Sequence, residues 1–432
     1  MTAILLVAIP AFGAGVGLLI RGKPHALKVC VLLVTIGTLG LIVMEGASGT
    51  LPEKPAALTL LALLPFAAFF TVLGQPAHRS LCAPWLLTLL LLGLGLGVLA
   101  YEAPLSLIFL FLVLALVGLL FFHARRRAGL DVRWGIGTIA LGMLGVVIGA
   151  TAGGPVSSIA LAIACATALP LVPFHKSYVA ALSWLPGNLP AFLAVLLPVA
   201  GYDGLVTVLP QLPEQVQDAA AILALMGMVY GSFKPFAQSR AASVVAYGGV
   251  AFFAIVWWYV LASRTAPVQT VVFMTAVALA TSGLHLAWSM LRARFGDIAL
   301  RALTGLAQPM PHFSIAVSLL AIAALGLPPF GVFSGFLGML LAPSFAWSGR
   351  LAIILFAWLA ASWYLFGLAQ GLLFGRSRPE YRPGDLRLPE LASLTIVLVL
   401  LAALGVMPFD FFGSDLGTQY QTVEMGSPLW NK

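Results

Sequence analysis

The chain has 432 residues, of which 61% are apolar and only 8% are Asp, Glu, Lys or Arg. Soluble domains carry about 25% charged and about 45–50% apolar residues, so the composition excludes a soluble enzyme, a disordered chain and a disulfide scaffold. The 22 Lys and Arg residues against 14 Asp and Glu give a net charge of +8. In so apolar a chain this excess is typical of loops retained in the cytoplasm, not of nucleic-acid binding.

The apolar residues are gathered into blocks long enough to cross a lipid bilayer. A bilayer core about 30 Å thick needs roughly 20 consecutive apolar residues per helix, and the sequence contains about 14 such blocks. Short loops join them, so no sizeable soluble domain is expected. The predicted membrane helices begin near Ala3, Leu27, Ala56, Ala83, Pro104, Trp134, Val156, Asn188, Asp218, Ala241, Val268, Phe313, Leu351 and Leu391.

The positive charges test this segmentation, because loops that stay in the cytoplasm are enriched in Lys and Arg. With these boundaries, 18 of the 22 Lys and Arg residues fall on one side of the membrane. That side is predicted to be cytoplasmic, and both termini are predicted to lie on the opposite, non-cytoplasmic side. Basic residues follow the first block and none precedes it, which predicts a retained first helix and not a cleaved signal peptide. The four exceptions are Lys54, Arg264, Arg350 and Lys432.

Two predicted helices, the seventh and the twelfth, are interrupted by proline. Proline removes a backbone N–H and clashes with the preceding turn, so breaks are expected near residues 168–176 and 325–336. The freed carbonyl groups are tolerated only inside a bundle or beside a wet cavity. An offset of five helices reverses the direction of crossing, as in the inverted repeats of transporters; kinks that serve packing alone are the alternative. The interrupting residues are Pro170 and Pro173 in the first stretch and Pro328, Pro329 and Gly331 in the second.

The chain is expected to divide into four parts, and the two breaks lie inside the second and the third. Residues 1–101 hold the first four helices, and residues 104–209 hold the remainder of the first repeat. Residues 217–375 form the second, inverted repeat, and residues 390–432 hold the last helix and an external tail. The predicted fold class is an all-α integral membrane protein of about 14 transmembrane helices, with two inverted five-helix repeats.

Short motifs along residues 55–375 occur in a characteristic order. The first is LPLVPFH at residues 169–175, followed by Pro186, Gly201 and Gly204. Further motifs are Tyr230-Gly231, Ala237-Gln238, Ala246-Tyr247, Leu300 to Leu306, Met310-Pro311 and Gly326 to Pro329. In this order the sequence resembles the antiporter-like subunits of respiratory complex I. The same family includes membrane subunits of multisubunit cation/proton antiporters, energy-converting hydrogenases, formate hydrogenlyase and inorganic-carbon-accumulating complexes. The resemblance implies the fold described above, with helices 7 and 12 broken.

The resemblance also implies a proton path, from which this sequence departs. In the family, protons pass along ionisable residues in mid-membrane: a Glu on helix 5, a Lys on helix 7, a Lys or His on helix 8, and a Lys or Glu on helix 12. Such groups suit a relay because burial and neighbouring charge move their pKa values toward neutrality. The aligned positions here hold no titratable side chain. They are Phe111, Ala168, Val199 (Pro198 if shifted by one) and Phe336.

Five other titratable residues are candidates for a proton path. Asp203 lies within the eighth helix, where a carboxylate should face a cavity, pair with Lys176 or His285, or stay protonated; hydration at the helix end is the alternative. His285 lies in mid-helix. It is predicted to be either a relay group or a hydrogen-bonded packing residue. His175 matches the family's His, and Lys176 beside it marks an entry funnel or a snorkelling topology charge. Glu102 is expected at the outer interface.

The loops contain no nucleotide-binding loop, metal-ligand cluster, nucleophile elbow or haem-ligand pair. No cofactor and no catalytic site of its own are therefore expected in this chain. The resemblance implies a proton-transporting subunit in the inner (cytoplasmic) membrane of a prokaryote, with other membrane and peripheral subunits as partners and no nucleic acid. A quinone reductase or hydrogenase type of oxidoreductase in another chain would supply the energy. The alternatives are a degenerate, non-conducting scaffold or anchor, a subunit of an inorganic-carbon uptake complex, and an independent secondary transporter.

Overall fold

Apolar helices form the whole of the described structure. The computed structural model describes residues 2–48, 55–128, 132–296, 303–341, 349–375 and 384–406, and every regular element in these ranges is a helix. Helices are expected here because only intrahelical bonds satisfy the backbone of such apolar runs in lipid. The predicted all-α membrane fold is confirmed. The tail after residue 406 and the motif residues from Leu300 to Ala302 lie outside the described part.

The helix boundaries follow the apolar blocks. In chain order the helices are α1 (Thr2–Leu19), α2 (Pro24–Ser48), α3 (Pro55–Leu73), α4 (Cys82–Ala100), α5 (Leu105–Ala128), α6 (Arg133–Thr151), α7 (Gly154–Ala168), α8 (Lys176–Trp184), α9 (Leu189–Val208), α10 (Glu214–Phe233), α11 (Ala241–Ser263), α12 (Val268–Phe295), α13 (Pro311–Ala324), α14 (Gly331–Leu341), α15 (Gly349–Leu373) and α16 (Leu388–Val406). Within the described ranges, ten helices are long and apolar enough to cross a membrane. Counting α7 with α8 and α13 with α14 as one crossing each would give the predicted fourteen. That number and the sides of the termini stay predictions.

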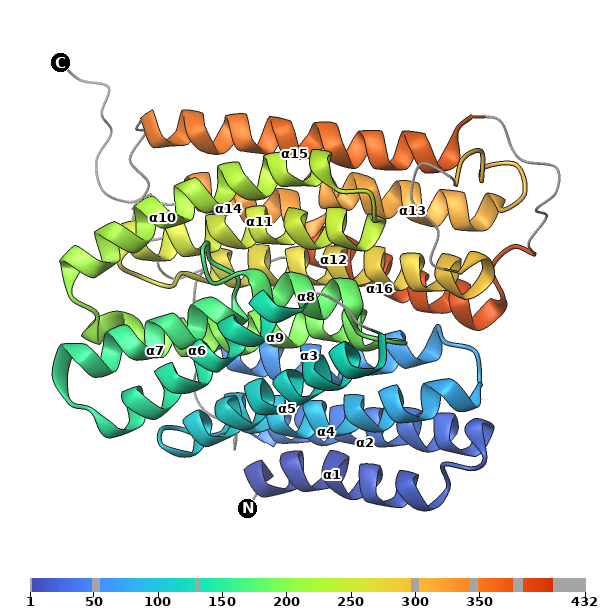
Figure 1. Ribbon diagram of the computed structural model, residues 1–432, viewed down its shortest axis with the longest axis horizontal. Helices are drawn as coiled ribbons and strands as arrows, with labels where there is room; N and C mark the ends of the chain where they lie inside the picture. The colour runs from blue at the N-terminus through green and yellow to red at the C-terminus, as the bar shows by residue number, and fades with distance from the viewer. Residues whose placement is uncertain are drawn as a thin grey trace.

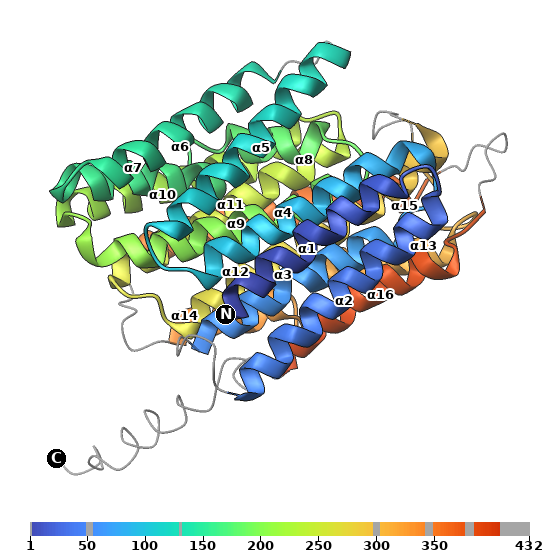
Figure 2. The ribbon, with the colours of Figure 1, turned by 90° about the horizontal axis from the view of Figure 1, so that it is seen from below.

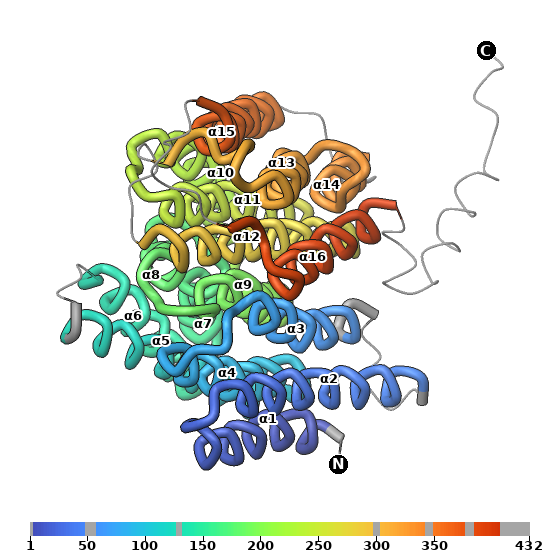
Figure 3. Tube along the Cα trace, turned by 90° about the vertical axis from the view of Figure 1, so that its right-hand side faces the viewer, coloured from blue at the N-terminus to red at the C-terminus, as the bar shows by residue number. Residues whose placement is uncertain are grey.

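The helices lie side by side in a stack that broadly follows the chain (Figure 1), from α1 at one end to α15 at the other. Figure 2 shows α5, α6 and α7 on one flank of the stack and α2 and α16 on the other. Figure 3 shows α16 returning to the middle, where it packs against α3, α12, α13 and α14. The apolar spans of α11 and α12 are wholly buried, whereas only 28% of the spans of α2 and α5 is buried. The core therefore lies along α11 and α12.

The first break is buried at its start. Helix α7 ends at Ala168, and α8 begins at Lys176. The carbonyl of Leu169, which the break removes from the helical ladder, accepts a hydrogen bond of 3.0 Å from the indole N–H of Trp257 on α11. Gly201 of α9 packs directly on the backbone of Leu169, so closely that a Cβ there would collide with it. The start of the first break therefore lies inside the bundle, whereas Pro173 near its end is exposed.

The second break differs from the first in its exposure. The carbonyl of Leu325 accepts a hydrogen bond of 2.9 Å from the indole N–H of Trp358 on α15, which parallels the first break. Leu327, Pro328 and Pro329 are nevertheless exposed on the surface of the chain. These three residues are therefore not enclosed by the rest of the described chain. Exposure is tolerated because the two prolines have no N–H to satisfy, and the N–H of Leu327 reaches the carbonyl of Ile322.

Candidate functional site

The first break brings a lysine, a histidine and two tyrosines together. Lys176 is the first residue of α8, and its Nζ donates to Oη of Tyr247 on α11 at 3.1 Å and of Tyr230 on α10 at 3.5 Å. The ring of His175 lies 5.2 Å from that of Tyr230 and 6.0 Å from that of Tyr247. We call these four residues the Lys176 cluster. Its amine meets hydroxyl groups and ring faces, an arrangement that stabilises a cation without a carboxylate.

His175 is the most deeply buried member of the cluster. The residue is 3% exposed, and both ring nitrogens are buried without a hydrogen-bond partner among the described residues. The carbonyl of Pro173 lies close to the ring but not in hydrogen-bonding geometry. A buried polar group without a partner costs about 1–3 kcal/mol, so its retention calls for a bound water or a proton-exchanging neighbour. The charges that act on the ring are the cations Lys176 and Lys234.

A cavity of about 660 Å³ lies beside α12. Its polar lining comes from the α3–α4 connection, the end of α8, one face of α12 and the segment before α16. Among its lining residues, His285, Ser289 and Arg292 occupy one face of α12, because residues four and three apart lie on one side of a helix. We call this cavity the vestibule. It lies among the loops of the side that is predicted to be cytoplasmic.

His285 forms part of the vestibule wall, separate from the Lys176 cluster. The residue is 2% exposed, and its Nε2 has no hydrogen-bond partner among the described residues. Gln75 crosses from the α3–α4 connection and donates from Nε2 to Oγ of Ser289 at 3.0 Å. This bond fixes the α3–α4 connection against α12, and it holds the vestibule's shape over a sequence separation of 214 residues.

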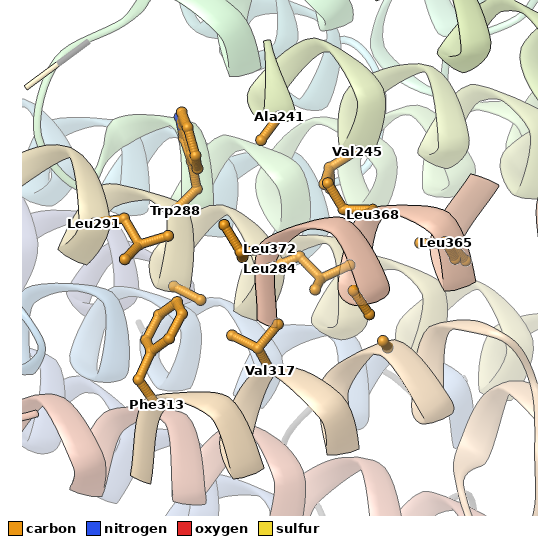
Figure 4. A pocket seen from close by; sticks show the side chains of 13 residues that line it. Ala241, Val245, Leu284, Trp288, Leu291, Phe313, Val317, Leu365, Leu368 and Leu372 are labelled. Atoms are coloured by element: carbon orange, nitrogen blue, oxygen red, sulfur yellow. The ribbon is translucent and has the colours of Figure 1, made fainter. Parts of the chain in front are cut away.

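The neighbouring face of α12 is apolar, and Trp288 at the border of the two faces lines both cavities. Figure 4 shows Leu284, Trp288 and Leu291 directed into a small cavity between α11, α12, α13 and α15, with Phe313 and Val317 facing them. The cavity measures about 30 Å³, and aliphatic and aromatic side chains line it. Apolar cavities of this kind stay dry. Water that reaches His285 therefore comes from the vestibule side.

The position aligned with the helix-12 relay lies in an aromatic cluster. The ring of Phe336 on α14 lies 4.2 Å from that of Trp358 and 6.2 Å from that of Phe273 on α12. Phe252 of α11 completes the group, 5.0 Å from Trp358. The other aligned positions are equally apolar: Ala168 and Val199 are fully buried, and Phe111 is half-buried. None of these side chains can carry a proton.

The remaining two candidates lie apart from the Lys176 cluster. Asp203 is half-buried on α9 and lies close enough to Cys165 of α7 to interact with it electrostatically. Glu102 is exposed in the α4–α5 connection, as expected of an interface residue. The hydrogen bonds of Lys176 go to the two tyrosines instead of to Asp203. As a proton path, the five predicted residues stay a prediction.

Sequence reasoning missed the site roles of Tyr230, Tyr247 and Arg292. The two tyrosines belong to motifs that carried the family resemblance, but nothing local shows that they meet Lys176. The spacing of His285, Ser289 and Arg292 was a visible signal, because it is the spacing of one helical face. Within the described residues, no three or more His, Cys, Asp and Glu side chains gather as metal ligands would.

Comparisons with known proteins agree with this architecture. Residues 151–362 match the family model described as NADH:quinone oxidoreductase/Mrp antiporter, transmembrane. NADH-quinone oxidoreductase subunit M of Pseudomonas aeruginosa is 29% identical over 258 residues, 57% of this chain and 49% of that protein. The Escherichia coli subunit M is 30% identical over 255 residues, 57% of this chain and 50% of that protein. The chain thus spans about half the length of the curated relatives it matches.

Solved structures share the fold over nearly the whole chain. A chain of respiratory complex I from Thermus thermophilus has a TM-score of 0.75 and 23% identity, covering 93% of this chain and 97% of its own length. A chain of an archaeal membrane-bound sulfane sulfur reductase has a TM-score of 0.81 and 14% identity, with 100% and 86% covered. Fold and site together define a multi-pass, antiporter-like membrane subunit. Over residues 151–362, just under half of its length, the chain is similar to the NADH:quinone oxidoreductase/Mrp antiporter family.

Proposed function

We propose that this chain is a proton-translocating, antiporter-like subunit of a multisubunit complex in a prokaryotic inner membrane. It carries no cofactor of its own, and partner subunits perform the energy-yielding chemistry. The matched relatives in Pseudomonas aeruginosa and Escherichia coli are named as quinone oxidoreductase subunits, which supports a redox-linked assembly. The chain's own residues supply the proton-carrying step.

The observation that carries the proposal is the position of Lys176. A half-buried amine stands at a break in a membrane helix, 3.1 Å from the hydroxyl of Tyr247 and beside the buried ring of His175. Amine, phenol and imidazole groups at such distances can exchange protons directly or through one water. Ionisable groups inside a membrane bundle carry a desolvation cost and commonly mark proton or substrate pathways.

The proposed path runs through the first break, where Lys176 meets two tyrosines of the second predicted repeat. The aromatic rings around Phe336 and Trp358 fill the second break, so the route ascribed to helix 12 in the family has no counterpart here. Protons instead reach the Lys176 cluster through the first repeat and the predicted cytoplasmic side. A chain with one usable break would depend on neighbouring subunits to complete the crossing.

The test is proton flux in the intact complex. The complex is purified through this chain and reconstituted in liposomes, and an imposed potassium diffusion potential drives proton uptake that an internal pH dye reports. Lys176→Met is expected to lower the rate by about 100-fold, the low end of what a positioned acid–base group contributes. Lys23→Met, which removes the same charge from an exposed position, should leave the rate unchanged. Equal rates for Lys176→Met and the unmodified complex would instead favour the non-conducting scaffold.

A further inference from the structure

The vestibule carries ionisable charge of one sign. Among the described residues that line it, the ionisable side chains are Arg292, Arg387, His78 and His285, and none is acidic. Both arginines are exposed. A concave wall with charge of a single sign concentrates the electrostatic potential inside the cavity and attracts ions of the opposite sign.

Two acidic side chains in the same region, Glu390 and Asp385, already have partners within the chain. Glu390 of α16 forms a two-pronged ion pair with Arg294, at 2.5 and 3.1 Å, and also accepts the backbone N–H of Arg387 at 2.8 Å. Asp385 accepts hydrogen bonds from the backbone N–H groups at the start of α13. Neither carboxylate lines the cavity, so the positive charge of Arg292 and Arg387 has no balancing anion from these two residues.

Two histidines that line the vestibule, His78 and His285, also bear on hydrogen bonding in it. Nδ1 of His78 accepts the backbone N–H of Ser80 at 3.3 Å, so the neutral ring keeps its proton on Nε2 as a donor. At the wall, Nε2 of His285 is buried without a partner among the described residues. A buried imidazole nitrogen without a hydrogen-bond partner carries a desolvation cost. A polar ligand in the cavity would offset this cost.

We propose that the vestibule is a binding site for an oxyanion, most simply a phosphate group. Arg292 and Arg387 hold the charge, and the anion reaches toward Nε2 of His285. Guanidinium groups bind phosphate oxygens through paired hydrogen bonds. A volume of about 660 Å³ lies within the range of about 300–1,000 Å³ usual for small-molecule sites. The cavity has room for a free, hydrated phosphate or for the phosphodiester of a lipid headgroup.

The two sources of phosphate are distinguished by two probes. The full chain is embedded in nanodiscs of phosphatidylcholine, and calorimetry measures the binding of inorganic phosphate at low salt. In a second arm, the discs contain equal amounts of phosphatidylcholine and phosphatidylglycerol, and native mass spectrometry counts the lipids that stay bound. Because neither arm measures proton flux, failure of this proposal is distinct from failure of the proposed function.

The decisive variant is Arg292→Gln combined with Arg387→Gln. Its matched control is Arg21→Gln with Arg125→Gln, which removes two exposed arginines on the same predicted side but outside the vestibule. We expect the vestibule variant to bind phosphate about tenfold more weakly, or to lose selective retention of phosphatidylglycerol, while the control behaves as the unmodified chain. Loss in the first arm identifies a free anion, and loss confined to the second identifies a lipid headgroup.

Two results would overturn the proposal. One is that the vestibule variant matches the unmodified chain in both arms. The other is that the control loses binding to the same extent, which would show a general charge effect. His285→Asn gives an independent check, because it removes the imidazole and leaves both arginines in place. It should weaken binding in the same arm, and unchanged binding would contradict the placement of the anion near Nε2 of His285.

Discussion

Lys176 depends on partners that lie far along the chain. Tyr230 and Tyr247 are 54 and 71 residues away, on two different helices. The break before α8 lets the lysine leave the helical ladder of α7 and turn toward α10 and α11. Its chemistry is thus a property of the folded bundle, although every member of the cluster is visible in the sequence.

A second residue, Asp385, shows how a single carboxylate can fix a helix. Its oxygens accept the backbone N–H groups of His312 at 2.8 Å and Phe313 at 3.2 Å, at the start of α13, and that of Leu386 at 2.8 Å. Burial works against the charged carboxyl, but these amide groups and the His312 ring outweigh it and hold the pKa of Asp385 below its usual range. The negative charge also complements the positive end of the α13 dipole.

The lowered pKa fixes the sign of a pH dependence. A carboxyl whose pKa is depressed on folding stabilises the protein above its unfolded value of about 3.9 and loses that effect as the pH falls through the folded value. At pH 7, Asp385→Ala should therefore lower the free energy of unfolding by about 0.5–2 kcal/mol, the usual contribution of a helix cap. The difference from the unmodified chain should begin to shrink as the pH falls below about 4 and should go on shrinking as the pH passes through the lower, folded pKa.

Thermal unfolding in detergent between pH 3 and pH 7 measures this effect. Asp218→Ala is the matched control, because Asp218 is exposed on α10. A constant difference between Asp385→Ala and the unmodified chain across the whole pH range would show that the charge of the carboxyl has no part in the cap.

At the scale of elements, the two broken helices are stabilised by the same kind of hydrogen bond. Each break frees a carbonyl, and in each case a tryptophan from a neighbouring helix donates its indole N–H to it. Trp257 is 1% exposed and lies in the core, so its hydrogen bond is formed away from water. The tryptophans supply the compensation that a break inside a membrane bundle requires.

Trp257→Phe is expected to destabilise the protein by about 1–3 kcal/mol, because it leaves the Leu169 carbonyl buried without a donor. The unfolding temperature in detergent measures the loss. Trp363→Phe on α15 makes the same chemical change at a position that is 75% exposed and should have almost no effect. If the two variants unfold at the same temperature, the hydrogen bond to the first break does not stabilise the fold.

The prolines predict both breaks from the sequence. The sequence does not predict which tryptophans donate hydrogen bonds to the carbonyl groups that the breaks free. Pro170 and Pro328 act locally, within one turn of their own helices, so their effect can be derived from neighbouring residues. Trp257 lies 88 residues from Leu169, and nothing local pairs them. Helix starts were accurate for the same reason as the breaks, since apolar length is a local property. The largest difference is between the expected Asp218 and the observed Glu214.

At the scale of the whole molecule, the two halves are unequal. The first break carries the Lys176 cluster, whereas rings around Phe336 and Trp358 fill the second. The vestibule lies between the halves and is lined by residues as far apart as Gln75 and Arg387. The sequence predicts apolar side chains at the relay positions, because the resemblance allows these positions to be compared one by one. It could not indicate the vestibule, which exists only when distant loops meet.

The inequality of the two breaks bears on the proposed function. If protons cross at the Lys176 cluster, the chain alone leaves the crossing incomplete, and adjoining subunits would complete it. The apolar residues Leu327, Pro328 and Pro329 at the second break are exposed on the surface of this chain.

Affinity purification of the tagged chain from its native membranes, in mild detergent, tests the subunit role most directly. We expect the chain to elute in a stable assembly with further membrane and peripheral subunits, identified by mass spectrometry and in fixed proportion to it. Recovery of the chain alone, as a monomer that retains its fold, would contradict this expectation.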